Sequence, residues 1–436
     1  MGGKWLSVLV LLMTCVMATS GEEKEKKNQL DLTLNLLGRG EMRFGGFTEG
    51  NADNQAKFLM GRTRLGIGYK RQYLEVKVTA QHSGIWGEKS MGSFNLHEAW
   101  AKLNTKNGLF AQIGRQVLSY DDERIIGAND WAMAANTHDV IRMGYEGRGH
   151  KAHMIFGFNQ NGENVSGGTY YSDGAQPYKI MQTLWYHYDV PKIPLGASFL
   201  FMNIGMQGEE TTDDGLTKPR NRYQQMLGGY ISYKPGKLTA EVSYYHQFGH
   251  DEYNAKINAW MASVRANLQI IKQVGTTIGY DYLSGDKYFA VTPKGMLGVV
   301  QHKYRGGFSP VYGSHHKFYG MMDFFYVQSF LNGFSPGLQN LYAGVSCNPI
   351  KGLSLSTTYH YMATATKLNG INKTLGHDID FEASYQVLKD ASVSLGFSYM
   401  TGTETMEKLK RTEEGNNLKW AWVSLVVSPR LFTYKW

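Results

Sequence analysis

Apolar and polar residues alternate in many short segments of this chain, and this alternation restricts the fold more than any other feature. In the segment 378–387, Ile379 and Phe381 share one parity, whereas Asp380 and Glu382 occupy the other. A period of two places the two sets on opposite faces of a β-sheet. The same pattern recurs in the segments 59–70, 73–81, 238–247, 353–361 and 392–399. We therefore expect an all-β fold.

The composition of the two faces distinguishes a membrane barrel from a soluble sandwich. Apolar faces often end in Tyr or Trp, and polar faces carry charged side chains. A membrane barrel has an aromatic girdle on its outside and a polar interior. A sandwich of 436 residues would need many more apolar core positions and proline-marked turns, but the chain has only 10 Pro against 51 Gly. The pattern therefore indicates a transmembrane antiparallel up-and-down β-barrel.

Short and long connections alternate along the chain, as they do in barrels with short periplasmic turns and long extracellular loops. Because both termini of such a barrel lie in the periplasm, the number of strands is even. The segment Lys317–Val327 resembles a strand, but counting it gives nineteen, so we place it within the long loop 285–337. The prediction is eighteen strands. They are expected at 30–47, 58–70, 72–81, 95–104, 108–117, 139–146, 150–158, 178–189, 195–206, 221–233, 237–247, 256–269, 272–284, 338–347, 353–361, 377–387, 391–400 and 418–428.

The N-terminal residues 1–20 have the features of a secretory signal peptide. Lys4 precedes the apolar run Leu6–Met17, and small residues follow this run. The run is shorter than the stretch of about 20 residues that a membrane-spanning helix requires. The remaining chain, 21–436, is predicted to form a single barrel domain.

The C-terminal residues also indicate an outer-membrane protein. Phe432, Tyr434 and Trp436 alternate at the end of the chain. Such alternation is the usual form of the signal that is read by the machinery assembling outer-membrane barrels. We therefore expect a location in the outer membrane of a Gram-negative bacterium, with membrane lipids and lipopolysaccharide around the barrel. The sequence leaves the oligomeric state open.

One long connection, between Gly114 and Met143, combines charged and apolar residues and reads GRQVLSYDDERIIGANDWAMAANTHDVIRM. It resembles a segment of the alginate-export family of outer-membrane porins. Tyr282–Asp286, followed by Phe308–Val327, is similar to a loop in the Bacteroidetes members of that family. The matching positions of the first segment are Gly114, Arg115, Gln116, Asp122, Arg124, Gly127, Trp131, Asp139 and Arg142. The resemblance implies an eighteen-stranded barrel with an arginine-rich lumen, which agrees with the strand count.

The resemblance also implies that the connection 118–138 folds into the barrel and narrows it. The residues of this expected constriction are Asp121, Asp122, Glu123, Arg124 and Trp131. The acids and the arginine are expected at the eyelet, and Trp131 is expected to fix the loop against the wall. Arg142 should then point into the pore just below, whereas Arg115 has the parity of the apolar face.

The polar faces of the predicted strands place basic residues toward the lumen. These channel-lining residues are Arg39, Arg43, Arg62, Arg64, Lys77 and Arg142. Fixed positive charge in a narrow pore attracts anions, and arginine binds carboxylates bidentately. The predicted function is passive diffusion of small anionic solutes, with uronate-type saccharides as a candidate class. Inward acids leave a nonselective general-diffusion porin as an alternative, because they could face the basic residues across the pore. These acids are Glu41, Glu75, Asp281, Asp378, Asp380 and Glu382.

Other functions have less support in the sequence. The net charge of +8 would suit nucleic acid, but the basic residues recur singly within strands, so no nucleic-acid binding is expected. No combination of Ser, His and acid forms a recognisable catalytic set, so an enzyme is the weaker alternative. His315, His316 and Asp323 match no established metal-ligand spacing, and we expect neither a metal nor another cofactor. A surface adhesin would need long apolar loops, and only 285–337 is long enough.

Overall fold

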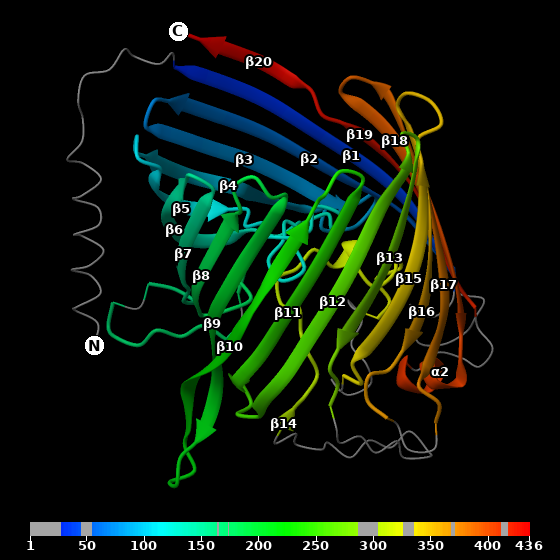
Figure 1. Ribbon diagram of the computed structural model, residues 1–436. Coiled ribbons are helices and arrows are strands. Elements are labelled where there is room, and N and C mark those ends of the chain that lie inside the picture. Colours follow the sequence, from blue (N-terminus) through cyan, green and yellow to red (C-terminus); the bar gives the residue numbers. More distant parts are fainter. Residues whose placement is uncertain are drawn as a thin grey trace.

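The computed structural model describes residues 28–44, 55–163, 165–172, 174–286, 304–325, 335–367, 371–410 and 417–436. They form one closed antiparallel β-barrel (Figure 1). Its strands are β1 (Gln29–Phe44), β2 (Gln55–Arg71), β3 (Leu74–Ile85), β4 (Ser93–Asn104), β5 (Leu109–Gln116), β6 (His138–Gly147), β7 (His150–Phe158), β8 (Ile180–Asp189), β9 (Leu195–Thr211), β10 (Thr217–Tyr233), β11 (Leu238–His250), β12 (Lys256–Ile271), β13 (Val274–Leu283), β14 (Tyr304–Arg305), β15 (Leu338–Cys347), β16 (Leu353–Ala363), β17 (Thr374–Leu388), β18 (Ala391–Gly402), β19 (Leu418–Val427) and β20 (Arg430–Lys435). The helical elements of these ranges are η1 (His315–Lys317) and α2 (Glu404–Lys410), and no described helix is long and apolar enough to cross a membrane.

The barrel wall contains eighteen strands. Of the twenty strands, β14 is a two-residue segment beside the start of β12, and β20 continues the line of β19 along β1. Because β1 pairs with β2 on one side and with β19 and β20 on the other, the barrel is closed. The predicted fold and the eighteen strands are confirmed. Residues 317–325 form the end of η1 and turns rather than a strand, as the even count required, and 326–327 lie outside the described residues.

The alternating pattern sorts side chains between the two faces of the wall. On β2, Leu65 and Ile67 are 44% and 50% exposed on the outside, whereas Arg62 is 2% exposed on the inside. Exposed apolar rows of this kind are covered by lipid in a membrane barrel. The period-two pattern therefore separates a lipid-facing surface from a polar lumen, as expected.

The two ends of the described chain meet at the end of the barrel that carries the short turns (Figure 1). The amide of Asn28 donates to the carbonyl of Trp436 at 2.8 Å, and the amide of Trp436 donates back at 3.1 Å. Phe432, Tyr434 and Trp436 are half exposed and stack in a row, with ring centroids 6.3 and 5.3 Å apart. The predicted signal peptide, residues 1–20, lies outside the described residues.

The main apolar cluster lies inside the barrel, where two long connections fold inward (Figure 1). We call them the first inward segment, 117–137, between β5 and β6, and the second inward segment, 306–325, between β14 and β15. The segments contribute the buried residues Leu118, Tyr120, Ile125, Ile126, Phe308, Tyr312, Phe318 and Tyr319, and the wall contributes Met202, Met226 and Met261. Burying these side chains away from water favours the folded-in position. This packing holds the charged residues of the lumen in place.

Candidate functional site

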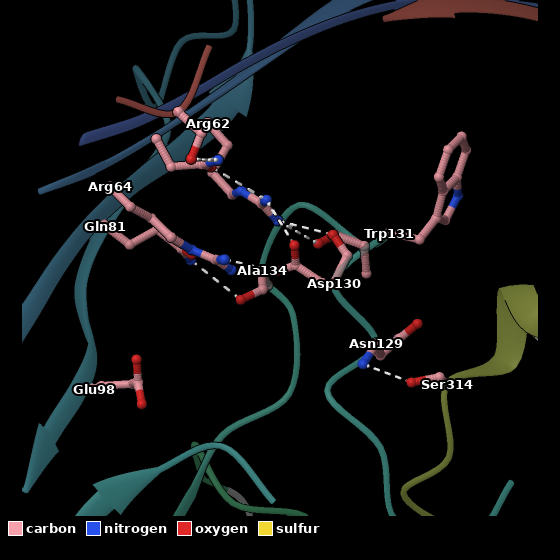
Figure 2. A network of polar contacts seen from close by, with 12 residues as sticks. Arg62, Arg64, Gln81, Glu98, Asn129, Asp130, Trp131, Ala134 and Ser314 are labelled. Carbon is pink, nitrogen blue, oxygen red and sulfur yellow. Dashed lines mark hydrogen bonds and ion pairs between the residues drawn. The ribbon is translucent and has the colours of Figure 1, made fainter. Parts of the chain in front are cut away.

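Two arginines of β2 hold the first inward segment against the wall. Asp130 lies between them: Arg62 Nη2 is 3.1 Å from Asp130 Oδ2, and Arg64 Nη1 is 2.6 Å from Asp130 Oδ1 (Figure 2). Arg62 also donates to the Asp130 carbonyl at 2.9 Å. Gln81 of β3 donates to the carbonyl of Ala134 at 3.1 Å. The side chain of Asp130 remains 58% exposed, so this charged group borders the open lumen.

The indole of Trp131 is surrounded by one arginine and three aromatic side chains. Arg39 of β1 donates to the Trp131 carbonyl at 3.0 Å and places its guanidinium 3.9 Å from the centre of the indole ring. His316 of the second inward segment stacks on the same indole at 3.8 Å with an interplanar angle of 7°. Trp420 and Trp422 of β19 approach it edge-on at 5.9 and 4.9 Å. Trp131 therefore joins β19 and the second inward segment to the basic wall, as we call the inner face of β1 to β6 with Arg39, Arg43, Arg62, Arg64, Lys77 and Arg142.

Arg124, a residue of the first inward segment, has a buried side chain that does not face open water. Its side chain is 1% exposed and forms ion pairs with Asp122 at 3.2 Å and with Asp281 of β13 at 3.1 Å. Its guanidinium lies 4.0 Å from the ring of Phe318, and it donates to the Tyr319 hydroxyl at 3.0 Å. Burial works to lower the pKa of Arg124, but the neighbouring Asp281, Tyr319 and Asp122 outweigh it and hold the pKa well above its usual value. Arg124 thus fastens the segment to the wall as a permanent cation.

The three acids that precede Arg124 point to different partners and do not form one group. Asp121 accepts a hydrogen bond from Trp185 Nε1 of β8 at 3.2 Å, and burial raises the pKa of its carboxyl. Asp122 pairs with Arg124. Glu123 accepts hydrogen bonds from Ser119 at 2.6 Å and from Ser314 at 2.9 Å, and it pairs with Lys317. The structure therefore brings Asp122 and Arg124 together and separates Asp121 and Glu123 from them.

The two inward segments form one unit. Ile126 and Tyr312 form a parallel bridge, and Asn136 donates to the carbonyl of Tyr312 at 3.2 Å. The amide of Asn129 donates to Ser314 Oγ at 2.8 Å (Figure 2). We call this pair of segments the inward unit. Sequence reasoning assigned the constriction to the first segment alone, and it left the path of 285–337 open.

Acids of β17, a strand separated from β1 by β18 and β19, are covered by the second inward segment. The amide of Met321 donates to Asp380 Oδ2 at 2.9 Å, and Asp380 also accepts a hydrogen bond from Ser398. Gly320 has a φ of +87°, and a Cβ on it would lie 2.6 Å from Asp378 Oδ2, so only glycine allows this close cover. Asp378 and Asp380 are 2% and 3% exposed. A cavity of about 400 Å³ remains between this segment and the wall, and Glu382 is among the residues that line it.

The remaining predicted lining residues differ in their partners. Arg43 pairs with Glu41 at 2.7 Å, and Lys77 pairs with Glu98. Arg142 donates to Gln112 at 2.6 Å, and it contacts no carboxylate in the described part of the chain. Arg115 instead pairs with Asp139 at 2.7 Å, and both residues have the outward parity of their strands.

The link between Glu123 and Lys317 predicts a loosening of the inward unit in acid. Burial works to raise the pKa of Glu123, but hydrogen bonds from Lys317, Ser119 and Ser314 outweigh it and hold the pKa below its usual value of 4.5. A lowered pKa means that the link stabilises the folded state fully above about pH 4.5 and loses this effect as the pH falls through the lowered value. We expect spontaneous fluctuations of the single-channel current to be constant from about pH 8 to 5 and to increase as the pH falls below 4.5.

The matched variant for this prediction is Glu123→Gln, which keeps the shape of the side chain and removes its charge. It should fluctuate at neutral pH as the unchanged protein does in acid. A variant that keeps the full acid response would show that another group is responsible.

A family model described as alginate export matches residues 87–410, a range that runs from just before β4 to the end of α2 and includes both inward segments. The chain belongs to the alginate export family. The match confirms the resemblance that the first inward segment suggested. The search of curated proteins found no match.

Solved structures show the same barrel as this alginate export family member. OpdL of Pseudomonas aeruginosa is 14% identical, with 92% of this chain and 99% of that chain covered and a TM-score of 0.61. OccK2 (OpdF) of the same organism, solved in complex with glucuronate, is 12% identical, with coverages of 92% and 98% and a TM-score of 0.60. A BenF-like porin from Pseudomonas fluorescens Pf-5 is 12% identical, with coverages of 93% and 99% and a TM-score of 0.59. At such identities the likeness shows the fold alone. Family and fold together support an outer-membrane channel of the porin type.

Proposed function

We propose that this channel allows passive diffusion of small solutes and prefers anions, with uronate-type saccharides as the candidate substrates. Its selectivity is set beside the inward unit, where Asp130 and the basic wall border the lumen. The observation that carries the proposal is the ratio of charges on this wall. Two arginines face one carboxylate at Asp130, and two more, Arg39 and Arg43, face one carboxylate at Glu41.

Within the part of the chain that the structure describes, the basic wall has more basic residues than carboxylates in its ion pairs. Among the described residues, five of the six basic residues predicted to line the channel pair with three carboxylates, Glu41, Asp130 and Glu98, and Arg142 bonds to Gln112 instead. Two of the cations are accessible, since the side chains of Arg43 and Lys77 are 33% and 43% exposed. Accessible fixed charges attract counter-ions and raise their local concentration in a narrow pore.

The cover over the acids of β13 and β17 distinguishes this proposal from a nonselective pore. The side chains of Asp281 and Asp380 are 1% and 4% exposed, because Arg124 and the second inward segment lie over them. Buried and covered acids contribute less to the selectivity of the aqueous path than accessible cations do. The field across the lumen is then dominated by the basic wall.

Carboxylate recognition supports the choice of uronates. The guanidinium groups of Arg62 and Arg64 already bind the carboxylate of Asp130 from two sides. The same geometry suits a carboxylate that passes through the lumen, because guanidinium binds planar oxyanions with two parallel donors. OccK2 (OpdF), which shares the fold, was solved with glucuronate. A uronate is therefore the substrate class with the most support.

Swelling of liposomes that contain the purified protein tests this proposal. We expect glucuronate to enter severalfold faster than glucose, which has the same ring and no carboxylate. Equal rates for the two solutes would instead support the nonselective porin. Empty liposomes provide the baseline for both solutes.

We also propose that the C-terminal row Phe432, Tyr434 and Trp436 is recognised by the barrel assembly machinery. These rings are half exposed and stacked on the last strand, so they are accessible as a linear motif.

A further inference from the structure

A groove without large side chains at its floor crosses the outer face of β1, β2 and β19. Its volume is about 680 Å³, and its lining includes Gly40, Met42, Leu59, Trp86 and Val423. Most outward positions of this barrel carry Leu, Val, Ile or aromatic residues, but Gly40 lies on the floor of this groove, and Gly38 and Gly61, which pair with each other, line a neighbouring groove. A Cβ on Gly40 would meet only the side-chain ends of Leu59 and Val423, so the floor of the groove is made of backbone.

Trp86 forms one wall of this groove. Its amide donates to the carbonyl of Leu59 at 2.9 Å, and a Cβ on Gly61 would lie 2.9 Å from its Nε1. The indole therefore lies directly on β2 and is still 67% exposed. A second groove of about 590 Å³ begins on its other side. Tryptophan prefers the boundary between the apolar band and the polar headgroups, which fixes the level of the groove in the membrane.

Two lysines stand at the outer edge of the groove. Lys57 of β2 is paired in register with Met42, and Lys419 of β19 is paired with Phe44. Both lysines are exposed, and neither contacts an acid within the described ranges; Lys419 Nζ lies 6.0 Å from the ring of Tyr399. Glu88 is the acid nearest in sequence to Trp86. Its carboxylate accepts a hydrogen bond from the amide of Ile85 at 3.0 Å and contacts neither lysine.

The height of these lysines along β1 matches the headgroup region. From Leu30 to Met42 the strand advances twelve residues, which at about 3.3 Å per residue and a tilt of roughly 40° gives on the order of 30 Å. The apolar band of such barrels is about 25 Å tall. Lys57 and Lys419 therefore lie just beyond the apolar band on the side of the long loops.

We propose that this groove binds lipopolysaccharide of the outer leaflet. One acyl chain lies over the glycine floor beside Trp86, and phosphate groups of the sugar headgroup pair with Lys57 and Lys419. Charge complementarity decides the occupant. A zwitterionic phospholipid has no net charge to satisfy two unpaired lysines. A second copy packed with the same face would bring its own lysines against them, and such like-charge contacts are unfavourable.

Native mass spectrometry of the full chain in mild detergent, titrated with purified lipopolysaccharide, tests the site. Replacing Lys57 and Lys419 by Gln together should weaken binding at least about tenfold, because each lysine near an anionic membrane surface contributes appreciably to attraction. Gly40→Leu should weaken binding similarly by filling the groove, and it should fold, since the added Cβ would approach only the movable side-chain ends of Leu59 and Val423. Dephosphorylated lipopolysaccharide should bind the unchanged protein as weakly as the intact glycolipid binds the lysine variant.

The matched control is Lys389→Gln, an exposed lysine in the short turn between β17 and β18, which should bind as the unchanged protein does. Equal affinity of the double lysine variant and this control overturns the proposal. A dimer of the unchanged protein that Gly40→Leu abolishes would overturn it as well, because a second copy would then occupy the groove. Neither result depends on the selectivity of the lumen.

Discussion

Replacing Arg124 by Met should destabilise the protein by about 3–5 kcal/mol, because it leaves the carboxylates of Asp281 and Asp122 buried without their cation. The side chains of Asp281 and Asp122 are 1% and 6% exposed, so water replaces little of the lost interaction. The loss should fall on the inward unit, which Arg124 fastens to β13. We expect lower resistance to urea unfolding in lipid vesicles and a larger, noisier single-channel conductance.

The matched control for this prediction is Arg115→Gln. Arg115 also pairs with an aspartate at 2.7 Å, but the two side chains are 29% and 38% exposed. Exposed pairs contribute about 1 kcal/mol or less, so this variant should keep both stability and conductance. Adding Asp281→Asn and Asp122→Asn to Arg124→Met should restore much of the stability, since no buried carboxylate then lacks a partner. If Arg124→Met unfolds at the same urea concentration as Arg115→Gln, the proposed role of this cation is wrong.

The second large effect is expected from the charges around Asp130. Arg64→Gln removes one of the two cations that face this carboxylate, so the ratio of anion to cation permeability should fall severalfold. Asp130→Asn removes the carboxylate and leaves both arginines, so the same ratio should rise. The measurement is the reversal potential of each variant in a KCl gradient.

The opposite expected changes in the permeability ratio distinguish an effect of charge from an effect of structure in this pair of variants. Both substitutions break the ion pair between Arg64 and Asp130, and both therefore loosen the first inward segment to a similar degree. A purely structural effect would shift the permeability ratio in the same direction in both. If the permeability ratio shifts in the same direction in both variants, the position of the loop, and not the charge of these residues, sets the selectivity.

The sequence was sufficient to predict the wall of the barrel. Outward residues such as Leu65 and Ile67 differ from Arg62 and Arg64 in polarity at every second position, and this contrast reports the face directly. The even number of strands, combined with short and long connections, also placed residues 317–325 outside the wall. These features are local or follow from a counting rule, so one sequence reveals them.

The partners of the inward charges could not be predicted in the same way. Arg124 pairs with Asp281, which is 157 positions away, and Trp131 stacks on His316. No spacing rule connects residues on two irregular segments, because their contacts depend on how both segments fold inside the wall. The one available signal was the aromatic and glycine content of Phe308–Val327, unusual for a solvated loop. That signal predicts burial but not the residues that meet.

The reversal potential of the unchanged protein in a planar bilayer with a KCl gradient tests the central proposal most directly. An excess of accessible positive charge on the wall of β1 to β6 predicts a potential whose sign corresponds to chloride permeating faster than potassium, with the preference decreasing as salt screens the fixed charges. A potential of the opposite sign, or a potential of zero at low salt, would contradict the account of this lumen.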